Sequence, residues 1–179
     1  MSRGNARPAS ATAERAYIGL GANLGRPIAQ VRAAIAELEK WGPARASSLW
    51  RSEPLGGEPG QSWYVNAVVE LELAGDAFAC LARLRALERA AGRPDRRARF
   101  APRVLDLDLL LFGGDIVDTP ELVVPHPGLA KRRFVLAPLA ELAPALVPPG
   151  ETRSVADMLR DLDDPLRVEN LGPGTEDTP

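Results

Sequence analysis

The chain has 179 residues, of which 45% are hydrophobic and 26% are charged, and its formal net charge is −2. This apolar content is sufficient for one globular domain with its own core. A weakly acidic chain is not expected to bind nucleic acid or a membrane surface. The N-terminal residues lack the apolar centre of a secretory signal, and no apolar run is long enough to span a membrane. We therefore expect a soluble cytoplasmic protein, and we expect it to be a monomer.

Periodic segments alternate with turn-forming residues along the chain. Strand candidates alternate apolar and polar residues, whereas helix candidates repeat apolar residues every three or four positions. In chain order these segments are a strand at Ala16–Leu20, a helix at Pro27–Lys40, a strand at Ala44–Arg51, a strand at Trp63–Leu73, a helix at Asp76–Ala91 and a strand at Val104–Phe112. This order predicts an α+β protein with a ferredoxin-like βαββαβ core, in which helices cover one face of an antiparallel sheet.

The remaining segments are shorter or lack periodicity. Extra C-terminal elements are expected between residues 115 and 162, including small helices at Arg133–Leu142 and Ser154–Leu162. The ends of the chain are small, polar and proline-containing. We therefore expect a disordered tail at 1–14, the folded domain at 15–165 and a flexible C-terminal tail at 166–179.

Cys80 is the only cysteine, which excludes an intrachain disulfide and a cysteine-rich metal site. Its apolar neighbours Ala79, Leu81 and Leu84 predict a thiol packed in the core and not a nucleophile.

Two aspartates in the last predicted strand are the strongest chemical signal. Residues two apart on a strand point to the same face, so Asp106 and Asp108 lie together while the alternating leucines face the core. Two adjacent carboxylates repel each other unless a cation lies between them. Hard oxygen ligands of this kind suit Mg²⁺ that is completed by substrate phosphates. The alternative is an edge strand with two solvated aspartates.

A basic segment leads directly into this strand. Five arginines and a single acid lie between Arg93 and Arg103. Guanidinium groups bind phosphate oxygens in pairs, and phosphoryl transfer depends on such charge neutralisation. The alternative is a solvated charge run on a surface loop.

His126 is the only histidine, and prolines stand on both sides of it. It could hydrogen-bond a phosphate or a leaving group, or it could be a structural residue of a turn.

The sequence GLGANLG, at residues 19–25, resembles a nucleotide-binding loop only superficially. The dinucleotide fingerprint requires a glycine where this chain has Leu24, and no Walker A motif is present. We therefore predict a strand-to-helix turn here, with Asn23 facing a ligand.

Aromatic and amide side chains that could bind a planar heterocycle lie beside the Gly/Pro-rich loop Ser52–Ser62. They are Trp63, Tyr64 and Asn66, with Phe134 further along the chain. The alternative is that the three aromatic residues belong to the core.

Together these segments resemble the 6-hydroxymethyl-7,8-dihydropterin pyrophosphokinase family over about Ala16 to Gly150. The stretches that carry the resemblance are AYIGLGANLG, SLWRSEPLG, WYVNAVVELE, ALERAAGR, FAPRVLDLDLLLFG and VPHPGLAKRRFVLAPLAELAP. The family transfers pyrophosphate from ATP to the pterin hydroxymethyl oxygen, which attacks the β-phosphorus, and releases AMP in folate biosynthesis. The loops Ser52–Ser62 and Gly92–Pro102 are then expected to close over both substrates.

The resemblance also implies roles for particular residues. Asp106 and Asp108 are expected to hold two Mg²⁺ ions, and Arg93 and Arg103 to contact the phosphates during transfer. The implied ATP site consists of Arg85, Glu88, Arg103, Leu109, His126 and Arg132. The implied pterin pocket consists of Ser52, Pro54, Leu55, Tyr64, Asn66 and Phe134.

Three positions depart from the common family pattern. Phe100 stands where a tryptophan is common, Pro127 replaces a frequent tyrosine, and Asp95 occupies a place that often carries a basic residue. None of them touches the metal-binding carboxylates, so the reaction is expected to be unchanged.

Two other classes of protein share the predicted topology. RNA-recognition domains need a basic strand with repeated aromatic residues, whereas Val104–Phe112 is acidic and leucine-rich. A regulatory ligand-binding domain has no need of an arginine-rich segment beside paired aspartates. Nucleotide binding that is lost without Mg²⁺ separates the enzyme from both alternatives.

Overall fold

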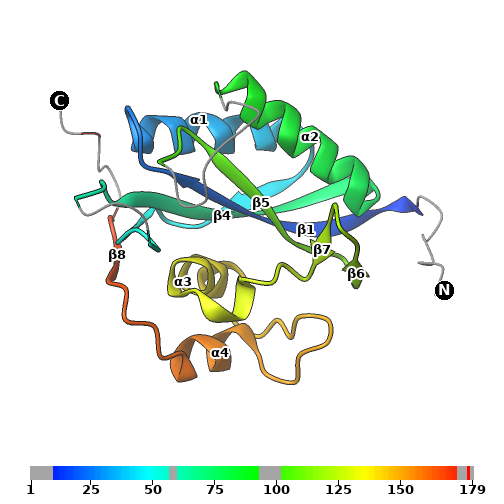
Figure 1. Ribbon diagram of the computed structural model, residues 1–179. Helices are drawn as coiled ribbons and strands as arrows, with labels where there is room; N and C mark the ends of the chain where they lie inside the picture. The colour runs from blue at the N-terminus through cyan, green and yellow to red at the C-terminus, as the bar shows by residue number, and fades with distance from the viewer. Residues whose placement is uncertain (1–9, 57–59, 93–101, 173–176, 178–179) are drawn as a thin grey trace.

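An antiparallel sheet with helices on both faces forms the protein (Figure 1). The computed structural model describes residues 10–56, 60–92, 102–172 and 177. The main sheet has the order β5-β1-β4-β3-β8, with β2 also paired to β4, and a small second sheet joins β6 to β7. The elements are β1 Ser10–Ala22, α1 Pro27–Glu39, β2 Ala44–Ala46, β3 Trp50–Ser52, β4 Tyr64–Gly75, α2 Ala77–Ala90, β5 Asp106–Phe112, β6 Val117–Asp118, β7 Val123–Val124, η1 Leu129–Lys131, α3 Arg133–Leu142, α4 Val155–Asp161 and β8 Val168–Asn170. The predicted α+β class, with an antiparallel sheet and flanking helices, is confirmed.

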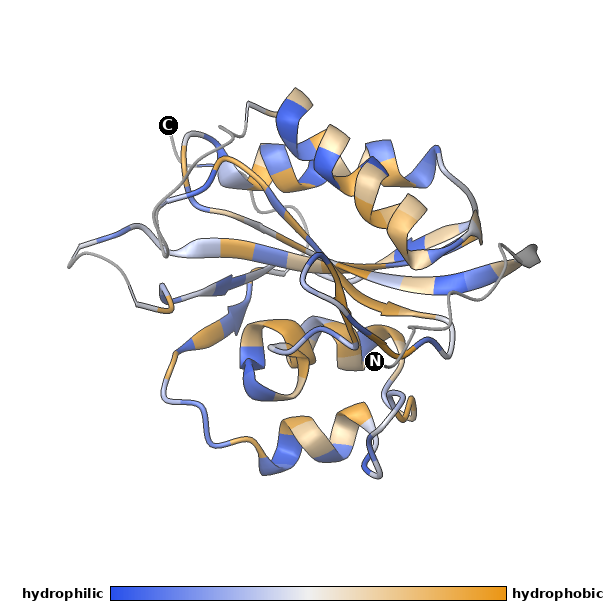
Figure 2. Cartoon of the chain, turned by 45° about the vertical axis from the view of Figure 1, so that its right-hand side comes forward, coloured by the Kyte–Doolittle hydropathy of each residue, from blue (hydrophilic) through white to orange (hydrophobic). Residues whose placement is uncertain are grey.

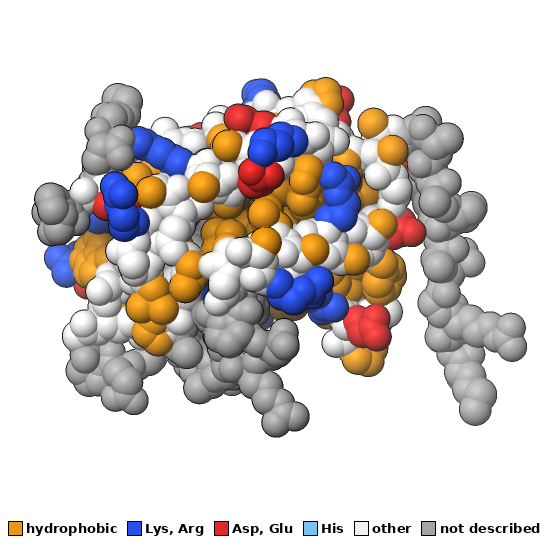
Figure 3. Space-filling view, turned by 90° about the horizontal axis from the view of Figure 1, so that it is seen from above, with side chains coloured by type: hydrophobic (Ala, Val, Ile, Leu, Met, Phe, Trp, Pro, Cys, Tyr) orange, Lys and Arg blue, Asp and Glu red, His pale blue; other side chains and the backbone are white. Residues whose placement is uncertain are grey.

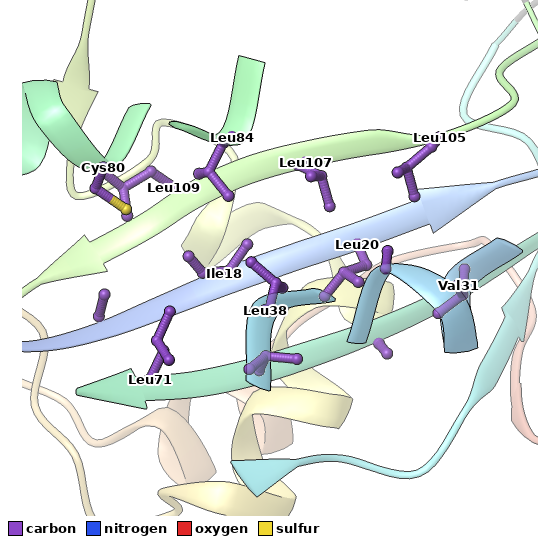
Figure 4. Packing of buried hydrophobic residues seen from close by; sticks show 14 of the residues in the cluster. Ile18, Leu20, Val31, Leu38, Leu71, Cys80, Leu84, Leu105, Leu107 and Leu109 are labelled. Atoms are coloured by element: carbon purple, nitrogen blue, oxygen red, sulfur yellow. The ribbon is translucent and has the colours of Figure 1, made fainter. Parts of the chain in front are cut away.

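The first core layer lies between the sheet and helices α1 and α2. Figure 4 shows Ile18 of β1, Leu71 of β4 and Leu107 of β5 pointing toward side chains of the two helices. Leu38 of α1 and Leu84 of α2 are fully buried there. The alternating leucines of β5 therefore face the core, as the period of two predicts.

A second core layer lies on the opposite face, where α3 and α4 cover the sheet. Val68, Leu110, Leu136 and Met158 are buried in it, and Figure 2 shows hydrophobic residues in the helices on both sides of the sheet. The two helices of the predicted core, α1 and α2, thus cover one face as expected, and the extra C-terminal helices, whose position the sequence did not predict, cover the other. The alternation along β4 did not reveal this cover because the second face also holds polar side chains, such as the buried Asn66.

Capping explains where the first two helices begin. Asp76 precedes α2, and its side chain accepts a hydrogen bond from the backbone N–H of Ala79 at 2.8 Å. Helix α1 begins with Pro27 and has no such bond from its own N-cap residue. Instead the carboxylate of Asp177 accepts from the N–H groups of Ile28 and Ala29, at 2.8 and 3.0 Å. A distant C-terminal residue thus caps the helix.

Four predicted boundaries differ from the structure. The strand predicted at Ala44–Arg51 is divided into β2 and β3. Between them the backbone N–H of Ser48 donates to the carboxylate of Glu141 in α3, at 2.7 Å, and not to a neighbouring strand. Strand β1 continues to Ala22 and includes Gly19 and Gly21 of the predicted turn. It begins at Ser10, inside the predicted N-terminal tail. Part of the predicted flexible C-terminal tail is strand β8, which pairs with β3.

The surface seen from the side of α1 and α2 mixes basic and acidic side chains (Figure 3). In the described part of the chain, no helix is both long enough and apolar enough to cross a membrane.

Cys80 is confirmed as a core residue with 0% exposure, and burial raises the pKa of its thiol to about 12. Because the thiolate is the reactive species, we expect no labelling by a disulfide reagent at about pH 8 while the protein is folded. Titration in denaturant should release the single thiol. Rapid labelling of the native protein would contradict this packing.

Candidate active site

Two glycines of β1 form an open floor between β4 and β5. In the antiparallel register Gly21 lies opposite Asn66 on one side and Asp106 on the other, while Gly19 lies opposite Asp108. A Cβ atom at Gly21 would lie 3.4 Å from Oδ1 of Asn66, and a Cβ at Gly19 would lie 3.4 Å from Leu110. The absence of side chains at these positions leaves space above the sheet.

A cavity of about 230 Å³ occupies this space. Its walls come from β1, β3, β4, β5 and the start of α3. The lining includes Gly19, Gly21, Ser52, Glu53, Leu55, Gln61, Tyr64, Asn66, Arg103, Asp106, Asp108, Arg132 and Phe134. Five of the six predicted pterin residues are thus brought together; Pro54 is not among the lining residues.

A second cavity, of about 460 Å³, lies between α2, β5 and the segment around β7. Its lining includes Arg85, Glu88, Arg89, Leu107, Asp108, Leu109, Glu121, Leu122, His126 and Pro127. Four residues predicted for the ATP site therefore meet here, whereas Arg103 and Arg132 line the first cavity. Asp108 lines both cavities and marks their junction.

The two aspartates lie among several charged groups. The pKa of Asp108 is raised by removal of water from its carboxyl group and by repulsion from Asp106, although His126, Arg132 and Arg103 oppose the shift. The guanidinium group of Arg103 forms a hydrogen-bonded ion pair with Asp106. A bound cation would relieve the repulsion between the carboxylates, so the pair is poised to accept one.

His126 is held by backbone hydrogen bonds on both of its sides. The backbone N–H of His126 donates to the carbonyl of Leu110 at 2.9 Å. On the ring, Nδ1 accepts from the backbone N–H of Gly128 at 3.0 Å. Nε2 therefore carries the proton of the neutral ring and lies 3.9 Å from Oδ2 of Asp108. Burial lowers the pKa of the imidazole, which favours a neutral hydrogen-bond donor facing the junction of the cavities.

Asn23 does not face a ligand, contrary to the prediction from sequence. The residue is 4% exposed, and its amide donates to the carbonyl of Ser62 at 3.1 Å. Its Oδ1 accepts from the N–H of Arg103 at 2.7 Å, and its own N–H donates to the carbonyl of Arg103 at 2.9 Å. Asn23 therefore joins the entry to β5 to the segment before β4.

Some predicted residues fall elsewhere, and others were not predicted. Arg93 and two of the three departures from the family pattern, Asp95 and Phe100, lie outside the described residues. The third departure, Pro127, lines the second cavity. The prediction omitted Gly19, Gly21, Glu53 and Gln61. For the glycines a signal existed, since their spacing of two residues fits one face of a strand.

Glu88 supports the aspartate-bearing strand from α2. It is 3% exposed, and its Oε1 accepts a hydrogen bond from the N–H of Leu107, between the two aspartates, at 2.8 Å. Replacing Glu88 with Ala leaves this buried N–H without its acceptor, so we expect unfolding free energy to fall by about 1–3 kcal/mol.

The replacement of Glu88 by Gln is the matched control, because its side-chain oxygen can still accept. Denaturant melts of both variants measure the difference. Equal losses of stability in the two variants would mean that the hydrogen bond to Leu107 is not the cause.

The fold and the site together define a class of protein. Paired carboxylates at the junction of two cavities, with arginines beside them, are typical of enzymes that transfer a phosphate-containing group.

Comparison with known proteins identifies the family. The family described as 7,8-dihydro-6-hydroxymethylpterin-pyrophosphokinase matches residues 17–144. The chain is 43% identical over 136 residues to the 2-amino-4-hydroxy-6-hydroxymethyldihydropteridine pyrophosphokinase of Pseudomonas aeruginosa, covering 74% of this chain and 83% of that protein. It is 39% identical over 160 residues to the enzyme of the same name from Methylorubrum extorquens, covering 88% and 98%. The chain therefore belongs to the 7,8-dihydro-6-hydroxymethylpterin-pyrophosphokinase family.

Solved structures support the fold independently. The Plasmodium falciparum HPPK-DHPS crystal structure with pteroate aligns with a TM-score of 0.68 at 12% identity, over 87% of this chain. The present chain spans 43% of that longer chain. At this identity the likeness concerns the fold alone.

Proposed function

We propose that the first cavity binds 6-hydroxymethyl-7,8-dihydropterin and that the second binds ATP, so that the reacting groups meet at the aspartate pair. The reaction follows from the family: the chain transfers pyrophosphate from ATP to the hydroxymethyl group of the pterin, releasing AMP, in folate biosynthesis. The observation that carries the assignment of the cavities is that Asp108 lines both of them.

The first cavity suits a planar, hydrogen-bonding ring. No side chain rises from Gly19 and Gly21 on its floor, and Tyr64 and Phe134 supply aromatic walls. The amide nitrogen of Asn66 donates to the buried hydroxyl of Ser52 at 2.9 Å. This bond fixes the amide so that Oδ1 lies above Gly21, where it can accept a hydrogen bond from a ring N–H.

The second cavity suits a nucleotide whose phosphates reach the junction. Leu109 and Leu122 offer apolar surface for a base, whereas Arg85 and His126 can donate to phosphate oxygens. From the first cavity, Arg103 and Arg132 face the same junction. Guanidinium groups held there can stabilise charge that develops on the transferred group, without forming a covalent bond.

The aspartate pair fits Mg²⁺ better than a cation held by protein ligands alone. Among the residues that the structure describes, no group of three or more His, Cys, Asp or Glu side chains is placed to hold a metal. Two carboxylates with phosphate and water oxygens are the usual surroundings of Mg²⁺. Asp106 and Asp108 would hold two ions, which would neutralise the phosphates of ATP and orient them.

The finer statement of the fold is also a proposal. The order β5-β1-β4, followed by β2 and β3, is that of a ferredoxin-like sheet whose second strand is divided in two. We further propose a cytoplasmic monomer that binds no nucleic acid. The net charge of −2 supports the absence of a nucleic-acid partner, and the single buried thiol supports a reducing compartment.

Product analysis tests the function. Purified protein with ATP, Mg²⁺ and 6-hydroxymethyl-7,8-dihydropterin should yield AMP and a pterin diphosphate in equal amounts, and no product after chelation of the metal. Replacement of Asp108 by Asn keeps the size of the side chain but removes a charged ligand, so we expect turnover to fall by at least about 100-fold. Formation of ADP, or wild-type turnover in this variant, would contradict the proposal.

Asn66→Ala tests the assignment of the two cavities. The variant loses an acceptor above the floor of the first cavity, so we expect pterin affinity to fall by about tenfold, the effect of one hydrogen bond. ATP affinity should stay within about twofold, because Asn66 lies outside the second cavity. Calorimetric titration of each substrate separately checks both values; the reverse pattern would mean that the cavities are interchanged.

A further inference from the structure

An arginine near the C-terminus contacts both ends of the segment that connects β3 to β4, and residues at those ends line the first cavity. Arg167, which directly precedes β8, contacts Glu53 after β3 and Trp63 before β4. We propose that Arg167 is a positioning residue for the pterin, acting through these two contacts. This inference rests on the proposed function, because it assumes that the first cavity binds the pterin.

The contact with Glu53 consists of several bonds. The Nε of Arg167 donates to Oε1 of Glu53 at 2.9 Å, and its backbone N–H donates to Oε2 at 2.9 Å. In return the backbone N–H of Glu53 donates to the carbonyl of Arg167 at 3.1 Å. The two hydrogen bonds that Arg167 donates to the carboxylate of Glu53 hold the pKa of that group below its ordinary value. Glu53 is thereby fixed as a charged side chain beside the cavity that it lines.

The contact of Arg167 with Trp63 is a cation–π interaction, and Arg51 makes a second one with the same ring. The guanidinium carbon of Arg167 lies 4.9 Å from the centre of the indole ring, and that of Arg51 lies 5.0 Å from it. Arg51 is held in turn by Glu169 of β8, since its Nε donates to that carboxylate at 2.7 Å. Each arginine over the ring is therefore fixed by a glutamate.

These contacts act on residues that line the cavity. Ser52 and Glu53 lie at one end of the segment, and Tyr64 follows Trp63 at the other. The hydroxyl group of Tyr64 accepts from the amide of Gln61 at 3.2 Å, and Gln61 also lines the cavity. Because Arg167 fixes both ends before a ligand enters, less conformational freedom is lost on binding.

The exposure of the Arg167 side chain distinguishes a role in pterin binding from a general contribution to folding stability. The side chain of Arg167 is 68% exposed and that of Glu53 is 28% exposed. Exposed ion pairs add little to folding, so the effect of Arg167 should appear in pterin binding. The chain offers a matched control in Arg160, which is 67% exposed and pairs with Asp157 and Asp161 on α4, away from the cavity.

Titration calorimetry of Arg167→Ala, with 6-hydroxymethyl-7,8-dihydropterin, Mg²⁺ and a non-hydrolysable ATP analogue, tests the proposal. We expect the Kd for the pterin to rise about fivefold, whereas the Kd for the ATP analogue changes by less than about twofold. Arg160→Ala should leave both constants unchanged. Arg167→Lys keeps the charge beside Glu53 but not the planar fork, and should recover part of the affinity.

A double-mutant cycle shows whether Arg167 acts through Glu53. If it does, Arg167→Ala should weaken binding less in a Glu53→Gln background than in the wild-type protein. Wild-type pterin affinity in Arg167→Ala would overturn the inference, and so would an equal loss for both ligands, which indicates general destabilisation. Failure of the proposed function is a separate result, because the wild-type protein would then form no AMP.

Discussion

The antiparallel pairing of β1 with both β4 and β5 places the chemical groups of this protein. Its register sets Gly21 between Asn66 and Asp106, and Gly19 beside Asp108. Residues directly opposite on paired strands point to the same face, so the amide, the open floor and the carboxylates share one side of the sheet. A slip of one residue would turn the aspartates into the apolar core and bring leucines to the cavity. The leucines of β5 oppose this slip because their burial beneath α1 and α2 is favourable only in the observed register.

The second helical layer turns this face of the sheet into a cavity. Helix α3 packs against β4 and presents Phe134 near its first turn, next to Arg132. At its other end Glu141 accepts hydrogen bonds from the N–H of Ser48 and from the indole of Trp50, at 2.7 and 2.9 Å. One helix therefore supplies an aromatic wall and also fixes the strand that carries Ser52. The same cover buries the central strands on both faces, which makes the floor rigid.

Charge at the junction is balanced by groups from distant parts of the chain. Arg103 neutralises Asp106, and Asn23 holds the backbone of Arg103 through two strong bonds. The neutral His126 faces Asp108 from the segment after β7. Backbone hydrogen bonds therefore hold both Arg103 and His126 in place beside the carboxylates. The segment between Glu53 and Trp63 is held at its ends by Arg167, and β8 pairs with the adjoining strand β3.

The sequence alone determined the features that depend on local spacing. The period of two placed Asp106 and Asp108 on one face, the apolar repeats located α1 and α2, and Asp76 marked the start of α2. Spaced motifs were sufficient to indicate the family. The tertiary structure decided the rest: the glycine floor, the burial of Asn23, the cover by α3 and α4, and strand β8. These features arise from contacts between residues far apart in the chain, such as Asn23 with Arg103 or Glu53 with Arg167. Propensity and periodicity describe neighbours along the chain, so they cannot show which distant segments will share a cavity.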